Sequence, residues 1–235
     1  MKKVILTAVL SGLGYLAFGQ STNSFLEGTI AAGQRKFSGS AAYRYQWSLG
    51  KKRKFSIGVG GRITTFRGTD LYYETAPANI TSGKTGVTVI FTETIAANID
   101  SIQMASSSLT AINAMISLAY RPTTRWEIGF NIDAIGFTLG NEKNAQYING
   151  SQTTATTASP TRFNLLLTSD NDLGTLNSEL WLAYGISEKM HLKIGYQFLF
   201  TEYTTATAVQ TFPEPNDRFR NKGSLIALGV MYRLR

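Results

Sequence analysis

The feature that most constrains the fold of this chain is an alternation, residue by residue, of large apolar side chains with small or polar ones. In the last segment, one face of an extended chain would carry Ile226, Leu228, Val230, Tyr232 and Leu234. The opposite face would carry Leu225, Ala227, Gly229, Met231 and Arg233. A period of two residues is typical of a β-strand whose two faces meet different surroundings, and it is not the period of a helix.

The same alternation recurs upstream. Together with the last segment it predicts eight strands, at about 23–33, 41–49, 55–64, 112–120, 126–139, 176–186, 190–203 and 225–234. Trp181 is the exception, because its large ring falls on the otherwise small or polar face. It must either fit inside the fold or mark an error of phase.

The connections between these segments alternate in length. Three are tight and polar, namely "GKKRK", "RPTTR" and "SEKM". Three others are long, spanning 68–108, 140–175 and 204–221, and only the connection at 34–37 breaks the rule. Long loops are poor material for a compact soluble domain. They are expected at one end of an outer-membrane barrel, whose periplasmic turns are short.

The first nineteen residues have the features of a secretory signal peptide. Lys2 and Lys3 precede the apolar stretch 4–18, and Ala17-Phe18-Gly19 matches a small-x-small cleavage site. An uncleaved anchor is the alternative, although Ser11, Gly12 and Gly14 interrupt the stretch. The sequence therefore predicts a signal peptide over 1–19 and one barrel domain over 20–235. Cysteine is absent, which excludes disulfide frameworks and thiol chemistry.

At this point the sequence resembles the small outer-membrane β-barrels of the OmpA/OmpX kind. The resemblance implies an all-β, antiparallel transmembrane barrel of eight strands in the Gram-negative cell envelope, with ten strands as the alternative. The apolar residues in 69–108, and those in "FNLLL" at 163–167, either extend strands above the membrane or form a further hairpin. A β-sandwich would place many charged residues on its polar face, whereas here that face is mostly Gly, Ala, Ser and Asn. A soluble lipocalin-like barrel is a further alternative, and it would turn its apolar face inward, toward its own interior.

Aromatic residues of the apolar face lie close to the short turns. A girdle at one membrane interface has this arrangement, because Tyr and Trp place a ring in hydrocarbon and a polar tip at the headgroups. The predicted girdle is Trp47, Phe55, Tyr120, Trp126, Tyr184 and Tyr232.

The other face carries four acidic and four basic residues that would point into the lumen. Buried charges need partners, so the sequence predicts an ion-pair network of Glu27, Arg44, Arg62, Glu127, Asp133, Glu179, Lys193 and Arg233. Glu127, Lys193 and Arg233, with His191, are expected nearer the periplasm than the rest. Such a network would plug the barrel. The alternative is that the same charges line a narrow path for small solutes.

Little in the sequence points to catalysis. The one histidine, His191, is expected at the periplasmic end as a polar interface residue, and no GxSxG elbow is present. "SGKTG" lacks the first glycine of a phosphate-binding loop, and the spacing of "SDND" does not match an EF-hand. No catalytic, cofactor-binding or metal-binding residues and no cofactor are therefore assigned. A lipid-modifying enzyme is the weakest of three functional alternatives, behind a structural or interaction protein and a narrow channel.

The expected partners follow from this architecture. They are outer-membrane lipid and lipopolysaccharide, the barrel-assembly machinery, and a protein or ligand bound by the long extracellular loops. Gly229, Tyr232 and Leu234 resemble the assembly signal of a last strand, with departures at Ala227 and Arg235. The basic run 51–54 is interpreted as a solvated turn, so nucleic acid is not an expected partner.

Overall fold

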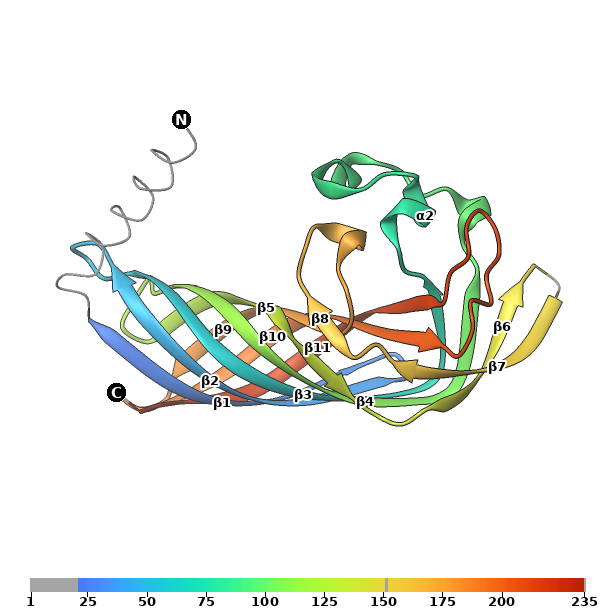
Figure 1. Cartoon of the computed structure of the whole chain (residues 1–235). Helices are drawn as coiled ribbons and strands as arrows, with labels where there is room; N and C mark the ends of the chain where they lie inside the picture. Colours follow the sequence, from blue (N-terminus) through green and yellow to red (C-terminus); the bar gives the residue numbers. More distant parts are fainter. Residues whose placement is uncertain (1–20, 151, 235) are drawn as a thin grey trace, which may run out of the picture.

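A computed structural model describes residues 21–150 and 152–234, which form one antiparallel sheet of eleven strands (Figure 1). Eight of them close into a ring in which each strand is hydrogen-bonded to the next. In ring order these are β1 (Thr22–Gly33), β2 (Lys36–Leu49), β3 (Phe55–Thr75), β4 (Ser101–Tyr120), β5 (Trp126–Leu139), β9 (Leu176–Gly185), β10 (Met190–Thr205) and β11 (Arg218–Arg233). The prediction of an eight-stranded antiparallel barrel is confirmed.

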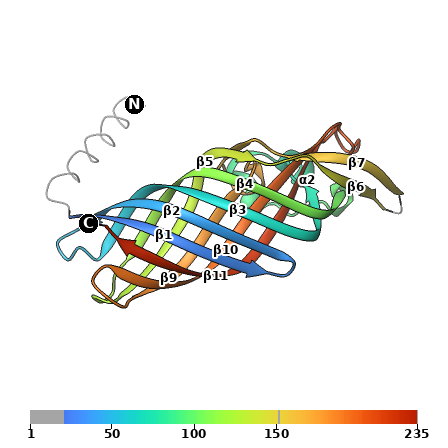
Figure 2. The same ribbon diagram turned by 90° about the horizontal axis from the view of Figure 1, so that it is seen from below.

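The ring closes between the first and last strands. β1 pairs with β11 from Phe25↔Arg233 to Ala32↔Ile226, and the two lie side by side in Figure 2. The tight connections at 50–54, 121–125 and 186–189 gather at one end of the barrel, called the short-turn end below. The predicted signal peptide and Arg235 lie outside the described residues.

The two faces of the ring differ as the alternation predicts. Large apolar side chains point outward and are exposed, while the charged and small residues between them are buried inside. On β10 the outward residues are apolar from Met190 to Phe200, and Glu202 follows. About ten residues of a tilted strand cross a membrane, so this apolar band has the height of a hydrocarbon layer.

β5 departs from the single phase that the sequence predicted over 126–139. A β-bulge shifts its register against β4, so that Asp133 faces Met115 whereas Ile135 faces Ala114. Beyond the bulge, Ile135, Phe137 and Leu139 point outward and extend the apolar band.

The long connections contain more sheet than the sequence indicated. β3 runs on to Thr75 and β4 begins at Ser101, so the first long connection is only 76–100. The second contains a hairpin of β6 (Lys143–Asn149) and β7 (Gln152–Pro160), followed by the three-residue β8 (Phe163–Leu165). The further hairpin therefore forms at 143–160 and not at 69–108, and it does not enter the eight-stranded ring.

This hairpin completes a second, smaller ring at the long-loop end. β6 pairs with β4, β7 pairs with β10, and β11 pairs with β3 at Phe219↔Thr75. β3, β4, β6, β7, β10 and β11 therefore close into six strands above the eight-stranded ring. The closure is possible because the β1–β2 hairpin ends early, at Gly33 and Lys36.

Short helical turns occupy the long loops. The connection 76–100 contains α2 (Ala78–Ser82), η1 (Gly86–Phe91) and η2 (Ala96–Asn98), and the segment after β8 contains η3 (Ser169–Asn171). Within 21–150 and 152–234, no helix has the length and apolar character needed to cross a membrane.

Candidate functional site

The lumen of the eight-stranded ring contains a chain of ion pairs. Arg44 Nε lies 2.6 Å from Glu27 Oε1, and Lys193 Nζ lies 3.0 Å from Glu27 Oε2 and 3.1 Å from Glu179 Oε1. The side chains of all four residues are buried. Lys193 thus lies level with Glu27 and Glu179. The sequence pattern had predicted a position below them, nearer the periplasm.

A second group of polar contacts joins this chain on the side of the long loops. Arg62 Nη2 lies 2.6 Å from Asp133 Oδ1, and its Nη1 lies 3.6 Å from Glu179. The other Asp133 oxygen accepts hydrogen bonds from Asn113 Nδ2 at 2.8 Å and from the backbone N–H of Asn177 at 3.0 Å. Asp133 is therefore saturated with donors, as a buried carboxylate must be.

Toward the short turns, the ion-pair network includes Arg121, which strand alternation did not predict. Glu127 pairs with Arg121 at 2.8 Å, and Arg44 Nη1 lies 3.9 Å away on the other side. Arg121 follows β4 in a tight turn, so strand alternation gave no signal for it. Its long side chain reaches back into the lumen.

Arg233 and His191 lie at this end without joining the ion pairs. Among the described residues, no acidic side chain lies within salt-bridge distance of Arg233, whose guanidinium instead stands 5.6 Å from the ring of Phe25. His191 is buried and meets the same ring edge-on at 6.4 Å. His191 therefore faces inward, which differs from the interface position expected for it.

Trp181 explains the exception in the sequence pattern. Its side chain is 1% exposed and lies inside the lumen across from Gly129. The guanidinium of Arg44 lies between two rings, 4.7 Å from Trp181 and 4.8 Å from Phe25. A cation held over aromatic faces gains attraction that partly offsets its lost hydration. Trp181 therefore lies inside the lumen, where its ring packs against the guanidinium of Arg44.

A residue of the second long connection closes over the ion pairs from the other side. Asn164, in β8, is fully buried and donates to Asn113 Oδ1 at 2.7 Å. Its own Oδ1 accepts hydrogen bonds from Thr138 Oγ1 and from the Thr175 backbone, both at 2.8 Å. The segment that the sequence placed in a surface loop thus contributes a polar residue to the lumen.

Above this layer the interior becomes apolar. A buried cluster fills the space within the six-stranded ring, with Phe66, Tyr73, Ile102, Met104, Leu109, Leu199, Tyr203, Phe219 and Leu225 among its members. Strand alternation did not predict this cluster, because most of these positions fall in segments assigned to loops or to the ends of strands.

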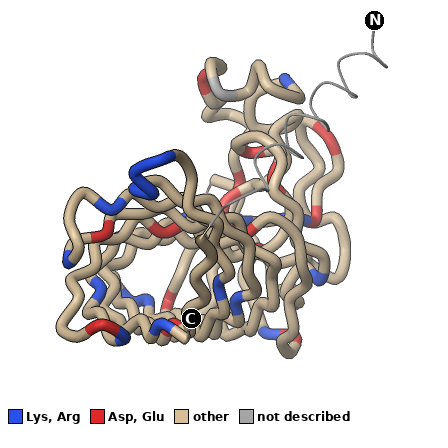
Figure 3. Tube along the Cα trace, turned by 90° about the vertical axis from the view of Figure 1, so that its left-hand side faces the viewer, with Lys and Arg blue, Asp and Glu red and all other residues tan. Residues whose placement is uncertain are grey.

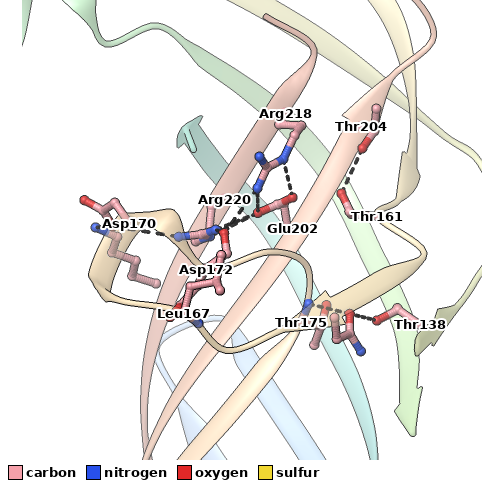
Figure 4. Close-up of polar contacts among 12 residues, drawn as sticks. Thr138, Thr161, Leu167, Asp170, Asp172, Thr175, Glu202, Thr204, Arg218 and Arg220 are labelled. Atoms are coloured by element: carbon pink, nitrogen blue, oxygen red, sulfur yellow. Dashed lines mark hydrogen bonds and ion pairs between the residues drawn. The ribbon is translucent and has the colours of Figure 1, made fainter. Parts of the chain in front are cut away.

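A separate charged cluster lies on the outside of β10 and β11 (Figure 4). Glu202 is fully buried and pairs with Arg218 and Arg220, each at 2.8 Å. Both arginines also donate to the backbone carbonyl of Asp172 in the loop after β8. We call this cluster the outer clamp, because it fastens the loop 166–174 against the barrel wall. The clamp also includes Asp170, whose Oδ1 lies 2.7 Å from Lys222 Nζ.

The six predicted girdle residues lie on the outer surface near the short turns. Phe55 faces Tyr120 with ring centroids 4.6 Å apart, and Trp126 faces Tyr184 at 4.8 Å. Trp47 lies beside Ile57 in the strand register, and Tyr232 lies beside Met190. All six side chains therefore lie on the outer surface within a few residues of the short-turn end.

The last strand places the three predicted assembly-signal residues on different surfaces. Tyr232 and Leu234 point outward and are exposed, whereas Gly229 faces the lumen. A Cβ at Gly229 would meet Gly28 O at 2.6 Å and the Lys193 stem at 3.2 Å. Gly229 therefore makes room for Lys193.

No protein-family model and no curated protein matches the chain. Solved structures with a similar course of the chain include the outer membrane protein Ail of Yersinia pestis (9% identity, TM-score 0.37, 91% of this chain and 100% of that chain). Others are a major outer membrane protein of Thermus thermophilus (13%, 0.37, 91% and 100%) and Neisserial surface protein A (9%, 0.35, 91% and 98%). The fold assignment rests on the strand pairing and the outward apolar band of this chain itself. By these two features, the chain is a small transmembrane β-barrel of eight strands.

Proposed function

We propose that this protein is an integral outer-membrane β-barrel with a closed lumen, a non-enzymatic structural or interaction role, and external loops that present a binding surface. On this proposal it reaches the outer membrane after export through a cleaved signal peptide. The observation that carries the closed lumen is the pairing of Glu27, Arg44, Glu179 and Lys193, whose side chains are at most 2% exposed. Charges that line a water path would keep contact with solvent.

Support for closure also comes from the interior above the ion pairs. An aqueous path would have to cross the apolar cluster, where Phe66, Tyr73, Tyr203 and Phe219 are each at most 1% exposed. Eight strands enclose a space that side chains just fill. Two independent layers, one charged and one apolar, therefore oppose the passage of solutes.

Single-channel recording of the purified, refolded protein in planar bilayers tests this proposal. We expect no steady open state, and a porin reconstituted in the same bilayers shows that openings are detectable. A long-lived, ion-selective conductance would contradict the closed lumen and favour the narrow channel. If Lys193→Ser then changes its selectivity, the ion-pair chain lines the path.

The interaction role draws on the six-stranded ring above the apolar band. Its outer surface carries a groove of about 790 Å³ between β3–β4 and the β6–β7 hairpin. The groove is lined by small and amide side chains together with Asp70, whose carboxylate is held by Arg35 and by Gln103. Such a lining offers hydrogen bonds and close approach with little charge, which suits a polypeptide or a glycan.

Photo-crosslinking in native membranes tests this surface. A photoreactive amino acid at Ala155 lines the groove, whereas one at Thr154 lies on the opposite face of the same strand. We expect a discrete adduct from position 155 and none from position 154. Equal adducts at both positions, or none at either, would contradict a specific binding surface in this groove.

A lipid-modifying enzyme finds no support in the surroundings of the one histidine. His191 is buried in the lumen at the short-turn end, against Phe25 and beside Gly185. A lipid acyl chain would approach from the outer surface, on the other side of the barrel wall.

A further inference from the structure

The first long connection exposes apolar side chains that nothing in the described chain covers. Phe91, at the end of η1, is 88% exposed, which leaves nearly its whole ring in solvent. Val87, four residues earlier in the same 3-10 helix, is 67% exposed. Contiguous exposed apolar surface marks sites of contact with a protein or a membrane.

The segment is held in place, so these side chains are presented at a fixed position. At the two ends of η1, the hydroxyls of Thr88 and Thr92 donate to the carbonyls of Thr85 and Thr88, both at 3.0 Å. Val89 points the other way and is buried. The chain on either side of η1 is tied together by the hydrogen bond from Ile95 N to Thr81 O at 2.8 Å.

Contacts with η3 fix the height of η1 on the barrel. Asn171 Nδ2 donates to Gly86 O at 3.1 Å, which joins the start of η1 to η3. The neighbouring Asp170 is bound to Lys222, which stands beside Phe200 in the strand register. Phe200 is the last outward apolar residue of β10. The helix η1 is therefore attached at the level where the apolar band ends.

The segment also lies to the side of the barrel and not over its opening. Viewed along the barrel axis, the connection that carries α2 stands beyond the ring of strands (Figure 3). Figure 1 shows the same displacement from a second direction. What lies beside a transmembrane barrel at the edge of its apolar band is the headgroup region of the membrane.

We propose that η1 is a membrane-contacting segment, which inserts Val87 and Phe91 into the interface of the leaflet that surrounds the long-loop end. The apolar surface already leads toward this region, because outward Phe163 on β8 pairs with outward Phe137 on β5. Short apolar segments bind at the boundary of headgroups and acyl chains in proportion to the area they bury. This inference rests on the proposed membrane-embedded barrel.

Depth measurements on labelled cysteine variants test the proposal. The chain contains no cysteine, so Phe91→Cys carries a single environment-sensitive fluorophore after refolding into phosphatidylcholine vesicles. Thr154→Cys, at the exposed hairpin, is the aqueous control, and Phe198→Cys, in the apolar band, is the membrane control. We expect lipids with a shallow nitroxide to quench the label at 91 several-fold more than the label at 154, and aqueous iodide to show the reverse order.

The controls separate two kinds of failure. If the label at Phe198 escapes lipid quenching, the barrel is not in the membrane and the proposed function fails. If the label at Phe198 is quenched while that at Phe91 behaves like that at Thr154, only the present inference is overturned. Protection of position 91 that grows with the protein-to-lipid ratio, and is lost on dilution, would assign this surface to a second copy and would likewise overturn it.

A variant without a label guards against disturbance by the fluorophore. Val87→Ser combined with Phe91→Ser removes the apolar contacts and leaves the threonine hydrogen bonds of η1. Lys84 is exposed just before η1. When trypsin is added to the protein reconstituted in vesicles, it should cleave at Lys84 several-fold faster in this double variant than in the wild type. Equal cleavage rates would contradict membrane contact.

Discussion

Trp181 on β9 lies directly across from Gly129 on β5, and a methyl group at Gly129 would come within 2.3 Å of the indole ring. Arg44 lies over the same indole at 4.7 Å. The glycine therefore leaves space for a large ring, and the ring in turn supports the arginine at the centre of the lumen.

Gly129→Ala should destabilise the barrel. The added methyl has no free space, because the carbonyl of Leu118 lies 2.8 Å from its position in addition to the indole. Overpacking of a buried site costs about 1–3 kcal/mol, which urea unfolding in lipid vesicles can measure. Gly61→Ala is the matched control on β3, because nothing in the described chain lies within 4 Å of its Cβ position. An equal loss of stability in both variants would mean that the Trp181 contact is not the cause.

Trp181 also shows what alternation predicts and what it does not. Alternation assigns a side chain to one of two faces, and this suffices for β1, β2 and β11, where the faces differ strongly. It fails above the apolar band, because both faces of a strand there carry similar residues. Tyr72 points outward and Tyr73 inward, and β7 carries threonine and alanine on both of its faces. A period-two signal vanishes when the two sides no longer differ.

The lumen was predictable for a related reason. Because side chains alternate between the two faces of a strand, Glu27, Arg62 and Asp133 are placed inside for any register between neighbouring strands. This alternation does not say which acid meets which base, since that depends on the stagger of the ring. Nor does it identify residues such as Arg121 and Asn164, which reach the lumen from a turn and from a loop segment.

Lys193→Met should be strongly destabilising. It leaves Glu27 and Glu179 in the lumen without the cation that both contact, and breaking a buried pair in this way costs about 3–5 kcal/mol. The double variant Lys193→Met/Glu179→Gln should recover part of the loss, because Glu27 keeps Arg44 at 2.6 Å. The coupling is measured by a double-mutant cycle, which compares the unfolding free energies of the wild type, Lys193→Met, Glu179→Gln and the double variant.

Lys54→Met provides the comparison for the loss of a lysine. Lys54 is exposed at a short turn and donates to the carbonyl of Pro122, at 3.1 Å. Its removal should change stability by no more than about 0.5 kcal/mol. If Lys193→Met proved equally mild, the lumenal ion pairs would contribute nothing measurable to stability.

Glu202→Gln should release the loop 166–174 from the barrel wall. The carboxylate is the anion that both Arg218 and Arg220 contact, and without its charge the buried Arg220 loses its main partner. Hydrogen exchange of the loop amides, followed by mass spectrometry, should become faster. Asp170→Asn should have a smaller effect, because its near partner Lys222 is 47% exposed and exposed pairs contribute about 0–1 kcal/mol, while Arg220 lies farther away, at 3.8 Å. Unchanged exchange in Glu202→Gln would show that the loop is held by other contacts.

Asp172→Asn should act in the opposite direction at neutral pH. Burial raises the pKa of Asp172, and the nearby carboxylates of Asp170 and Glu202 add to the rise, although the Leu167 N–H and Arg220 oppose it. A carboxyl whose pKa is higher in the folded loop stabilises that loop at pH values below its unfolded pKa, and the contribution is lost as pH rises through the folded pKa. At pH 7 the charged carboxylate therefore weakens the attachment of the loop.

The side-chain amide introduced by Asp172→Asn would remove the charge and keep an oxygen for the Leu167 N–H, which donates to Asp172 Oδ1 at 2.7 Å in the wild type. The loop amides of this variant should thus exchange more slowly than those of the wild type at pH 7, after correction for intrinsic rates. The difference should shrink on acidification, because the wild-type carboxyl takes up its proton at a pH above the usual range for aspartate. Faster exchange of the variant at pH 7, or a difference that widens on acidification, would mean that the charge of Asp172 helps to hold the loop. In that case the outer clamp would have to be understood as a balanced set of acids and bases, with Asp172 a partner of Arg220 through its carboxylate and not only through its backbone carbonyl.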